Sequence, residues 1–175
     1  MIIKVAKIQN SGREFDLRFE PPEIDLESEF AKVSGETLFK GKVSNSDLRT
    51  IVGGDLETEI ELKCNRCLQN IKDELKFSFK NAYILAEDYT KQEEFELEKE
   101  GLEISIFEGG EIDLKRIAGE QIALALATKV LCQKDCKGLC EKCGTNLNLI
   151  DCKCKENDID PRWSALKNLK IDNKQ

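Results

Sequence analysis

The 175-residue sequence contains no histidine, and this absence removes several classes of enzyme. Nucleophilic devices of the Ser-His-Asp and Cys-His kinds use an imidazole as general base, and many zinc hydrolases bind their metal through histidine. Nucleotide-binding glycine fingerprints are missing too, because five residues separate Gly35 from Gly41-Lys42 and Val43 stands where a Mg²⁺-binding Ser or Thr is needed. Any catalysis would depend on carboxylates alone or on a reactive thiol. We therefore expect a protein that is not an enzyme and has no small-molecule substrate.

Long apolar runs are equally scarce. No segment approaches the roughly 18 consecutive apolar residues of a membrane span. Residues 1–8 alternate like a strand and lack the apolar stretch of a signal peptide. With 40% hydrophobic and 35% charged residues, the composition is typical of a soluble globular protein. We expect a cytoplasmic chain with no membrane partner, long enough for one core and short for two.

Cysteine, in contrast, is abundant and clustered. The eight cysteines form four close pairs, 64/67, 132/136, 140/143 and 152/154, and six of them lie in residues 132–154 among Lys and Gly. The reducing cytoplasm disfavours disulfides, so paired cysteines there are typical of metal binding or redox chemistry. Their polar setting also differs from the apolar setting in which an idle thiol is buried. Four pairs supply the ligands of two tetrahedral metal sites.

Loop lengths favour one distribution of the pairs. Zinc takes four thiolates, and a two-residue loop such as Cys140 to Cys143 directs both sulfurs to one ion, with Gly144 free to take a positive φ. After eight more residues the chain can return with the 152/154 pair. Site 2 would then consist of Cys140, Cys143, Cys152 and Cys154, and site 1 of Cys64, Cys67, Cys132 and Cys136. The two other distributions of the pairs remain open.

Two Zn²⁺ ions are the expected cofactors, and two alternatives stand beside them. An Fe–S cluster is the first, although the cysteine spacing matches neither the bacterial nor the plant-type ferredoxin pattern. A cytosolic thiol-redox protein is the second, although neither Cys-x-x-Cys begins the helix of a βαβ unit, where a thiolate would be stabilised. An all-cysteine zinc site leaves no coordination position for an activated water. The sites are therefore expected to be structural.

The apolar patterns predict an α+β fold. Alternating residues predict strands over residues 2–8, 15–19, 33–43, 56–63, 71–79 and 102–106. The knuckle, Cys64 to Cys67, would form the tip of a long hairpin, and Gly53-Gly54 would be the turn before its first strand. Apolar residues at three- and four-residue spacing behind Asp113, an N-cap, predict a helix over residues 113–128. Asp160-Pro161 predicts the start of another short helix.

From these elements we expect a mainly antiparallel β body made of hairpins, with barrel-like closure as one option. One central amphipathic helix and a C-terminal, zinc-ribbon-like cysteine segment complete the architecture. Residues 1–131 would form the body, and residues 132–175 a metal-binding tail packed on it as part of one cooperative unit. Residues 87–103, with eight Asp or Glu, are predicted to be a solvated loop or edge, with an acidic docking segment as the alternative.

Charge is unevenly spread along the chain. Residues 1–128 carry 17 Lys and Arg against 27 Asp and Glu, whereas residues 129–175 carry 10 against 7. The cysteine-rich end is therefore the basic one, within a net charge of −7. Four thiolates around one Zn²⁺ carry a net negative charge, so the positive potential of this end is modest. Contact with nucleic acid is possible there, without strong nonspecific attraction.

Several motifs together resemble one family. They are Cys64-Asn-Arg-Cys67-Leu68, the helix start Glu111 to Leu114, Cys136-Lys-Gly-Leu-Cys140, Cys152-Lys-Cys154 and Asp160-Pro161-Arg162. With these motifs the chain is similar to the YceD family, the large ribosomal RNA subunit accumulation proteins. Some members keep the first two cysteine pairs and lack the last two, which supports the composition of site 1. The helix of that family usually ends in a proline, where this chain has Ala127-Thr128.

The resemblance implies a non-enzymatic factor for large ribosomal subunit biogenesis. It would support 23S rRNA accumulation or processing by binding that RNA or a precursor particle, and a protein-only chaperone or adaptor for a ribosomal protein is the alternative. Zinc knuckles present cations and stacking groups to irregular RNA on a rigid turn. The candidate RNA-binding residues are Arg66, Lys134, Lys137, Lys142, Lys153, Lys155, Arg162 and Trp163. Trp163 is equally suited to anchoring a core, and each lysine to a solvated surface.

Overall fold

The computed structural model of the chain describes residues 1–8, 12–46, 49–89, 104–154 and 162. The strands are β1 (Ile2–Lys4), β2 (Arg13–Phe19), β3 (Ala31–Val33), β4 (Thr37–Ser46), β5 (Arg49–Lys63), β6 (Asn70–Leu85), β7 (Ile104–Phe107) and β8 (Glu111–Asp113). The helices are α1 (Ala86–Tyr89), α2 (Leu114–Ala125) and two 3₁₀ turns, Val5–Lys7 and Pro21–Glu23. Among the described residues strands dominate and α2 is the one main helix, which is consistent with the predicted α+β class.

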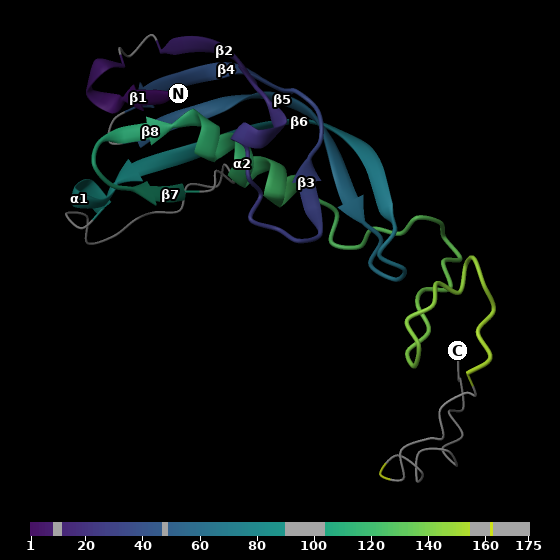
Figure 1. Cartoon of the computed structure of the whole chain (residues 1–175). Coiled ribbons are helices and arrows are strands. Elements are labelled where there is room, and N and C mark those ends of the chain that lie inside the picture. The colour runs from purple at the N-terminus through teal and green to yellow at the C-terminus, as the bar shows by residue number, and fades with distance from the viewer. Residues whose placement is uncertain (9–11, 47–48, 90–103, 155–161, 163–175) are drawn as a thin grey trace, which may run out of the picture.

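One large sheet forms the body (Figure 1). Its strand order is β2-β4-β5-β6-β7, and β3 pairs with the later part of β5. All neighbours are antiparallel except β6 and β7, which are parallel. Strand β5 is central because it pairs with β6 over its whole length, from Arg49 opposite Ile84 to Lys63 opposite Asn70. The predicted long hairpin is confirmed, and its tip carries the knuckle.

The N-terminal strand does not join the large sheet. Strand β1 instead pairs with β8 as a separate two-stranded ribbon, in which Ile3 lies opposite Ile112. Leu114 then donates its backbone N–H to the Met1 carbonyl at 3.0 Å, and this bond ties the N-terminus to the start of α2. Alternation predicted a strand over residues 2–8, but the strand ends at Lys4, before the 3₁₀ turn Val5–Lys7, and the pattern gave no information about its partner.

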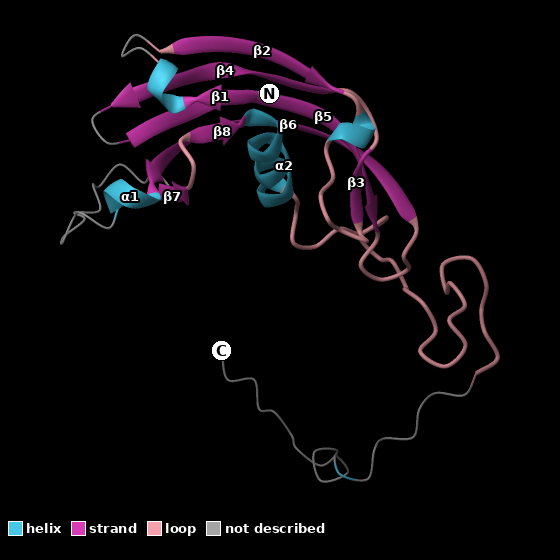
Figure 2. Ribbon diagram, turned by 60° about the vertical axis from the view of Figure 1, so that its left-hand side comes forward, coloured by secondary structure: helices cyan, strands magenta, loops and turns pink. Residues whose placement is uncertain are grey.

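Helix α2 covers the inner face of the sheet (Figure 2). Asp113 caps it by accepting the backbone N–H of Lys115 at 3.1 Å, as the sequence predicted. Ile117 and Ile122 of the helix are buried in the same core as Leu56 and Ile60 of β5. The sheets are open, so the option of a barrel-like closure is wrong. The apolar face of the sheet is covered by a helix and not by a continuation of the sheet.

The Gly53-Gly54 pair lies inside β5 and not at a turn, so that prediction is wrong. Gly54 stands opposite Gly41 of β4, and a Cβ atom on Gly54 would overlap the Lys40 carbonyl oxygen. The glycines therefore permit a close approach of two strand backbones. The predicted strand over residues 33–43 is likewise divided between β3 and β4.

Helix α2 ends at Ala125, three residues before the predicted end, and Leu126 is already extended with ψ 134°. The extended segment that follows the helix contacts the knuckle. Val130 donates its N–H to Asn65 Oδ1 at 2.6 Å and accepts the Asn65 backbone N–H at 2.9 Å.

The described part of the tail, residues 132–154, lies beyond the hairpin tip (Figures 1 and 2). Its regular structure is limited to an isolated bridge between Leu139 and Asn146. The predicted short helix at Asp160 and most of the acidic run lie outside the described residues, and one cooperative unit of body and tail stays a prediction. None of the described helices is long and apolar enough to cross a membrane.

The glycine contact between β4 and β5 gives a first prediction. We expect Gly54→Ala to lower the free energy of unfolding by about 1–3 kcal/mol, because the added methyl group has no room beside Lys40. Gly119→Ala in α2 is the matched control, since its Cβ meets Ile24 at an ordinary 3.5 Å, and it should raise stability by about 0.5–1 kcal/mol. Urea denaturation of both variants is the measurement. If the two variants changed the free energy of unfolding equally, this would contradict a close approach of the β4 and β5 backbones at Gly54.

Candidate metal centres

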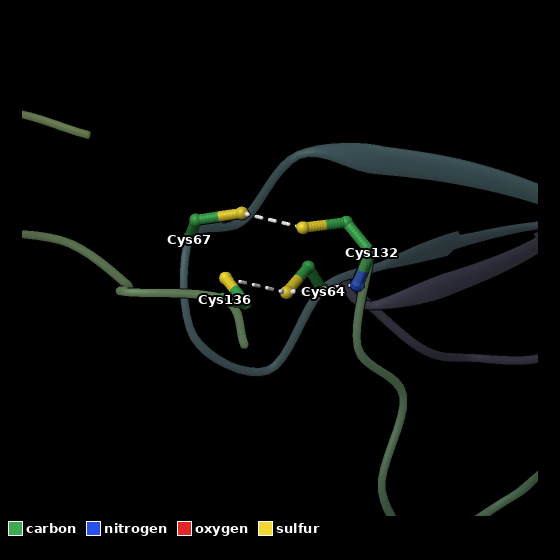
Figure 3. A group of neighbouring side chains, drawn as sticks. All are labelled: Cys64, Cys67, Cys132 and Cys136. Carbon is green, nitrogen blue, oxygen red and sulfur yellow. Dashed lines mark hydrogen bonds between the residues drawn. The ribbon is translucent and has the colours of Figure 1, made fainter. Parts of the chain in front are cut away.

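Site 1 joins two segments that are far apart in the chain. Cys64 and Cys67 belong to the knuckle between β5 and β6, whereas Cys132 and Cys136 follow α2. The four sulfur atoms face one another in the space between the two segments (Figure 3). All of them lie within 4.8 Å of one another. The site therefore links the hairpin tip to the tail.

The knuckle is a tight turn held by its own backbone. Leu68 donates its N–H to the Cys64 carbonyl at 3.0 Å, and the Cys64 N–H is donated to the Gln69 carbonyl at 2.9 Å. Closing the turn requires a positive φ of 58° at Leu68, an uncommon conformation for a residue with a side chain. The turn directs both sulfurs to the same side, where the tail segment brings the other pair.

The sulfur–sulfur distances fit a tetrahedral metal ion. Four ligands at the zinc–sulfur distance of about 2.3 Å place sulfur atoms about 3.8 Å apart in a tetrahedron. The Cys64 and Cys136 sulfurs are 3.8 Å apart, and those of Cys67 and Cys132 are 3.5 Å apart. The donor set of four thiols also suits zinc or iron. Site 1 thus has the ligands and spacing to hold such an ion.

Backbone N–H groups point at the Cys64 sulfur. Arg66 and Cys132 donate theirs at 3.5 and 3.4 Å. Burial opposes ionisation of the Cys64 thiol, but the N–H groups of Cys67, Arg66 and Cys132 outweigh it and lower its pKa from 9.0 to about 6. Burial and the adjacent Cys67 thiol raise the pKa of Cys132 to about 12. A bound divalent cation would favour the thiolate form of all four.

Site 2 lies within the tail. Cys140, Cys143, Cys152 and Cys154 also have sulfur atoms within 4.8 Å of one another. Gly144, with φ 71°, donates its N–H to the Cys140 carbonyl at 2.8 Å, and the Cys140 N–H is donated to the Thr145 carbonyl at the same distance. The predicted role of Gly144 in the return of this loop is confirmed by that positive φ.

The two sites differ in exposure. In site 1, Cys64, Cys67 and Cys136 are buried, whereas in site 2 Cys143 and Cys154 are exposed. Hydrogen bonds with Thr145 lower the pKa of Cys143 to about 6, and the neighbouring Cys143 sulfur raises that of Cys154 to about 12. Site 1 is therefore protected from solvent, while site 2 is open to small reagents.

The structure brings the eight cysteines together in the two groups that loop length favoured. Sequence reasoning missed the polar residues that support site 1. Asn65 holds Val130, and Arg66 donates from its guanidinium to the Cys136 carbonyl at 2.7 Å. Asn148 lies in the loop of site 2 but donates to the Cys136 sulfur at 3.3 Å. The sequence signal that could have identified Asn65 and Asn148 is an asparagine placed between two clustered cysteines, where its side chain can reach a nearby backbone or sulfur atom.

The structure places only some of the candidate RNA-binding residues at the cysteine-rich end. Arg66, Lys134, Lys137, Lys142 and Lys153 are exposed on the knuckle and the tail. Arg162 is exposed as well, but its neighbours in the chain are not described. Lys155 and Trp163 lie outside the described residues. The guanidinium of Arg66 is partly engaged by the Cys136 carbonyl, so this residue has a structural role besides its exposure.

Comparison with known proteins identifies one family. Residues 52–170 match the family model described as "Large ribosomal RNA subunit accumulation protein YceD". The match begins in β5 and includes both cysteine sites. No solved structure matches the chain.

Individual relatives differ in how much of the chain they share. The Arabidopsis thaliana protein named "Large ribosomal RNA subunit accumulation protein YCED homolog 1, chloroplastic" is 35% identical over 60 residues, 34% of this chain and 19% of that protein. An uncharacterized Mycobacterium leprae protein is 25% identical over 136 residues, 74% of this chain and 60% of its own length. The uncharacterized protein YlbN of Bacillus subtilis is 24% identical over 170 residues, 96% of this chain and 94% of its own length.

The separation of the two sites gives a second prediction. We expect native mass spectrometry of untagged protein to find two zinc ions per chain, and one in each of the variants Cys64→Ser and Cys143→Ser. Only Cys64→Ser should release the tail from the hairpin, with amide exchange at the tip rising by about tenfold or more. Coloured protein containing iron would indicate an Fe–S cluster instead. Metal-free wild-type protein purified under reducing conditions would contradict both sites.

Proposed function

Because the chain belongs to the YceD family, we propose that it is a non-enzymatic factor for large ribosomal subunit biogenesis, supporting the accumulation or processing of 23S rRNA. The family match over residues 52–170 is the observation that carries this proposal. The name of the Arabidopsis relative refers to the same role, although this chain spans only about a fifth of that protein. We propose that the chain works in the cytoplasm, where precursor particles assemble.

Zinc has a structural role in this proposal. Binding at site 1 connects Cys64 to Cys136 across a long loop, so its free energy contributes directly to holding the tail on the hairpin. A tetrathiolate ion offers no open position for substrate or water. A thiol-redox function is disfavoured for site 1 because three of its four sulfurs are buried, whereas a redox thiol has to be reached by its partner.

We propose that RNA, free or in a precursor particle, binds at the cysteine-rich end. Arg66 on the knuckle and Lys134, Lys137, Lys142 and Lys153 on the tail are exposed at this end. Residues 132–154 carry four Lys against three Asp or Glu, while each tetrathiolate zinc site adds negative charge. Recognition then depends on individual cations and backbone N–H groups on rigid turns, which suits irregular RNA better than a uniform duplex.

A third prediction tests this face. Charge reversal of Lys134, Lys137, Lys142, Lys153 and Lys155 to Glu should reduce cosedimentation with large-subunit precursors by about tenfold or more, because phosphate contacts are replaced by repulsion. Zinc content and the circular dichroism spectrum should stay unchanged.

The matched control reverses five exposed lysines on the body, Lys32, Lys40, Lys42, Lys72 and Lys80. This variant has the same net charge and should cosediment almost as well as the wild type. Equal losses in the two variants would indicate a general charge effect, and unchanged cosedimentation of the tail variant would rule out RNA contact by this face.

A protein partner is the second candidate. Three large apolar side chains are exposed at the tips of the cysteine loops: Leu68 at 49%, Leu149 at 77% and Ile150 at 63%. Exposed apolar groups on rigid turns are typical of protein–protein contact. A chaperone or adaptor for a ribosomal protein would use them together with the acidic body.

Pulldowns with and without RNase separate the two candidates, and this is a fourth prediction. If RNA is the partner, ribosomal proteins captured by the tagged chain should be lost after RNase treatment. The variant Leu149→Ser with Ile150→Ser should then capture as much as the wild type, because these side chains make no RNA contact. Capture that survives RNase and is lost in the Leu149 and Ile150 variant would favour the protein partner.

A further inference from the structure

Asn148 connects the two cysteine sites. It lies in the loop between Cys143 and Cys152, both of which are in site 2. Its side chain, however, points to site 1, where Nδ2 is 3.3 Å from the Cys136 sulfur. The carbonyl oxygen of the same side chain accepts the backbone N–H of Lys137 at 2.8 Å. A residue positioned by one site thus contacts a ligand of the other.

The orientation of this amide is fixed by chemistry. A backbone N–H such as that of Lys137 can only donate, so it has to face the oxygen of the Asn148 carboxamide. Gln133 Nε2 donates to the same oxygen at 3.2 Å. The NH₂ group therefore makes the two donated bonds, one to Asn146 Oδ1 in its own loop at 2.8 Å and one to the Cys136 sulfur, which accepts a hydrogen bond best as a thiolate.

The loop that carries Asn148 has a ligand of site 2 at each end. Cys143 and Cys152 hold its two ends, and Thr145 accepts the Cys140 backbone N–H. The loop then runs beside the segment between the sites, where Leu147 donates its N–H to the Gly138 carbonyl at 2.9 Å. Loss of metal from site 2 would release both ends of the loop, and Asn148 with it.

The bond matters because site 1 is buried. Four thiolates and one Zn²⁺ leave net negative charge there, and N–H donors to sulfur compensate for the lost hydration. Backbone N–H groups serve Cys64, and Cys136 receives the Gly138 backbone N–H together with the Asn148 side-chain donor from outside the site.

We propose that Asn148 couples the two sites, so that metal held at site 2 slows the loss of metal from site 1. The inference rests on the proposed zinc binding and goes beyond it, since two independent structural sites would satisfy that function equally well. Coupling is reciprocal, so an occupied site 1 also favours the ordered loop of site 2. Asn148 is a positioning residue here and not a metal ligand.

The test is a double-mutant cycle on the full chain loaded with zinc. One change removes Asn148 (Asn148→Ala), and the other empties site 2 (Cys152→Ser with Cys154→Ser). Metal loss from site 1 is measured without chelator, so that site 2 keeps its metal, as the initial rate at which a small amount of maleimide labels Cys64 and Cys67, identified by peptide mass spectrometry. Removal of outer-shell partners typically weakens metal binding by about 10–100-fold, so we expect each change alone to accelerate labelling by about tenfold.

The combined variant should be labelled no faster than either single variant, because both changes remove the same bond. Multiplied effects in the combined variant, or no effect of Asn148→Ala, would overturn the coupling while leaving two zinc sites in place. Wild-type protein that binds no zinc would overturn the proposed zinc role and the coupling together.

Two further variants separate the role of the Asn148 NH₂ group from that of its carbonyl oxygen. Asn148→Asp keeps the oxygen that accepts the Lys137 N–H but places a second oxygen beside the sulfur, so it should accelerate labelling at least as much as alanine. If Asn148 served only to hold the Lys137 N–H, Asn148→Asp would be labelled at the wild-type rate. That result would contradict the proposal. Asn70→Ala removes an exposed asparagine bonded to Glu61 and should leave the rate unchanged.

Discussion

The convergence of four sulfur atoms at the tip of the β5–β6 hairpin is the constraint on which the arrangement of the tail depends. Residues 132–154 have almost no regular backbone structure, and their apolar side chains Leu149 and Ile150 are exposed. Such a segment buries too little apolar surface to be ordered by packing alone. Metal coordination by cysteines supplies the missing free energy in small segments of this kind.

Several features of the body meet at this convergence. The hairpin tip lies against the returning chain, which leaves α2 at Ala125 and bonds to Asn65 through Val130. Asn65 and Arg66 sit between the two cysteines of the knuckle and both bond to the distant segment. The knuckle is therefore a docking point for the tail as well as a source of two ligands.

The function proposed for this protein is consistent with such an arrangement. A rigid turn fixed by sulfur ligands holds exposed cations and apolar groups in place without a large core behind them. An all-cysteine zinc site is closed, so in this proposal it would contribute shape and charge and not chemistry. The bond from Asn148 to the Cys136 sulfur joins the two turns.

The sequence by itself determined the local features: the knuckle between alternating strands, the Asp113 cap, and the short returns at Gly144 and Cys152 that define site 2. These follow from residues close together in the chain, where spacing limits the geometry. Tertiary structure decided the partner of β1, the position of Gly54 inside a strand, the open edges of the sheet and the contact of Asn148 with Cys136. Those depend on which distant backbones approach one another, and the free energy of such contacts is set by packing that residue spacing does not encode.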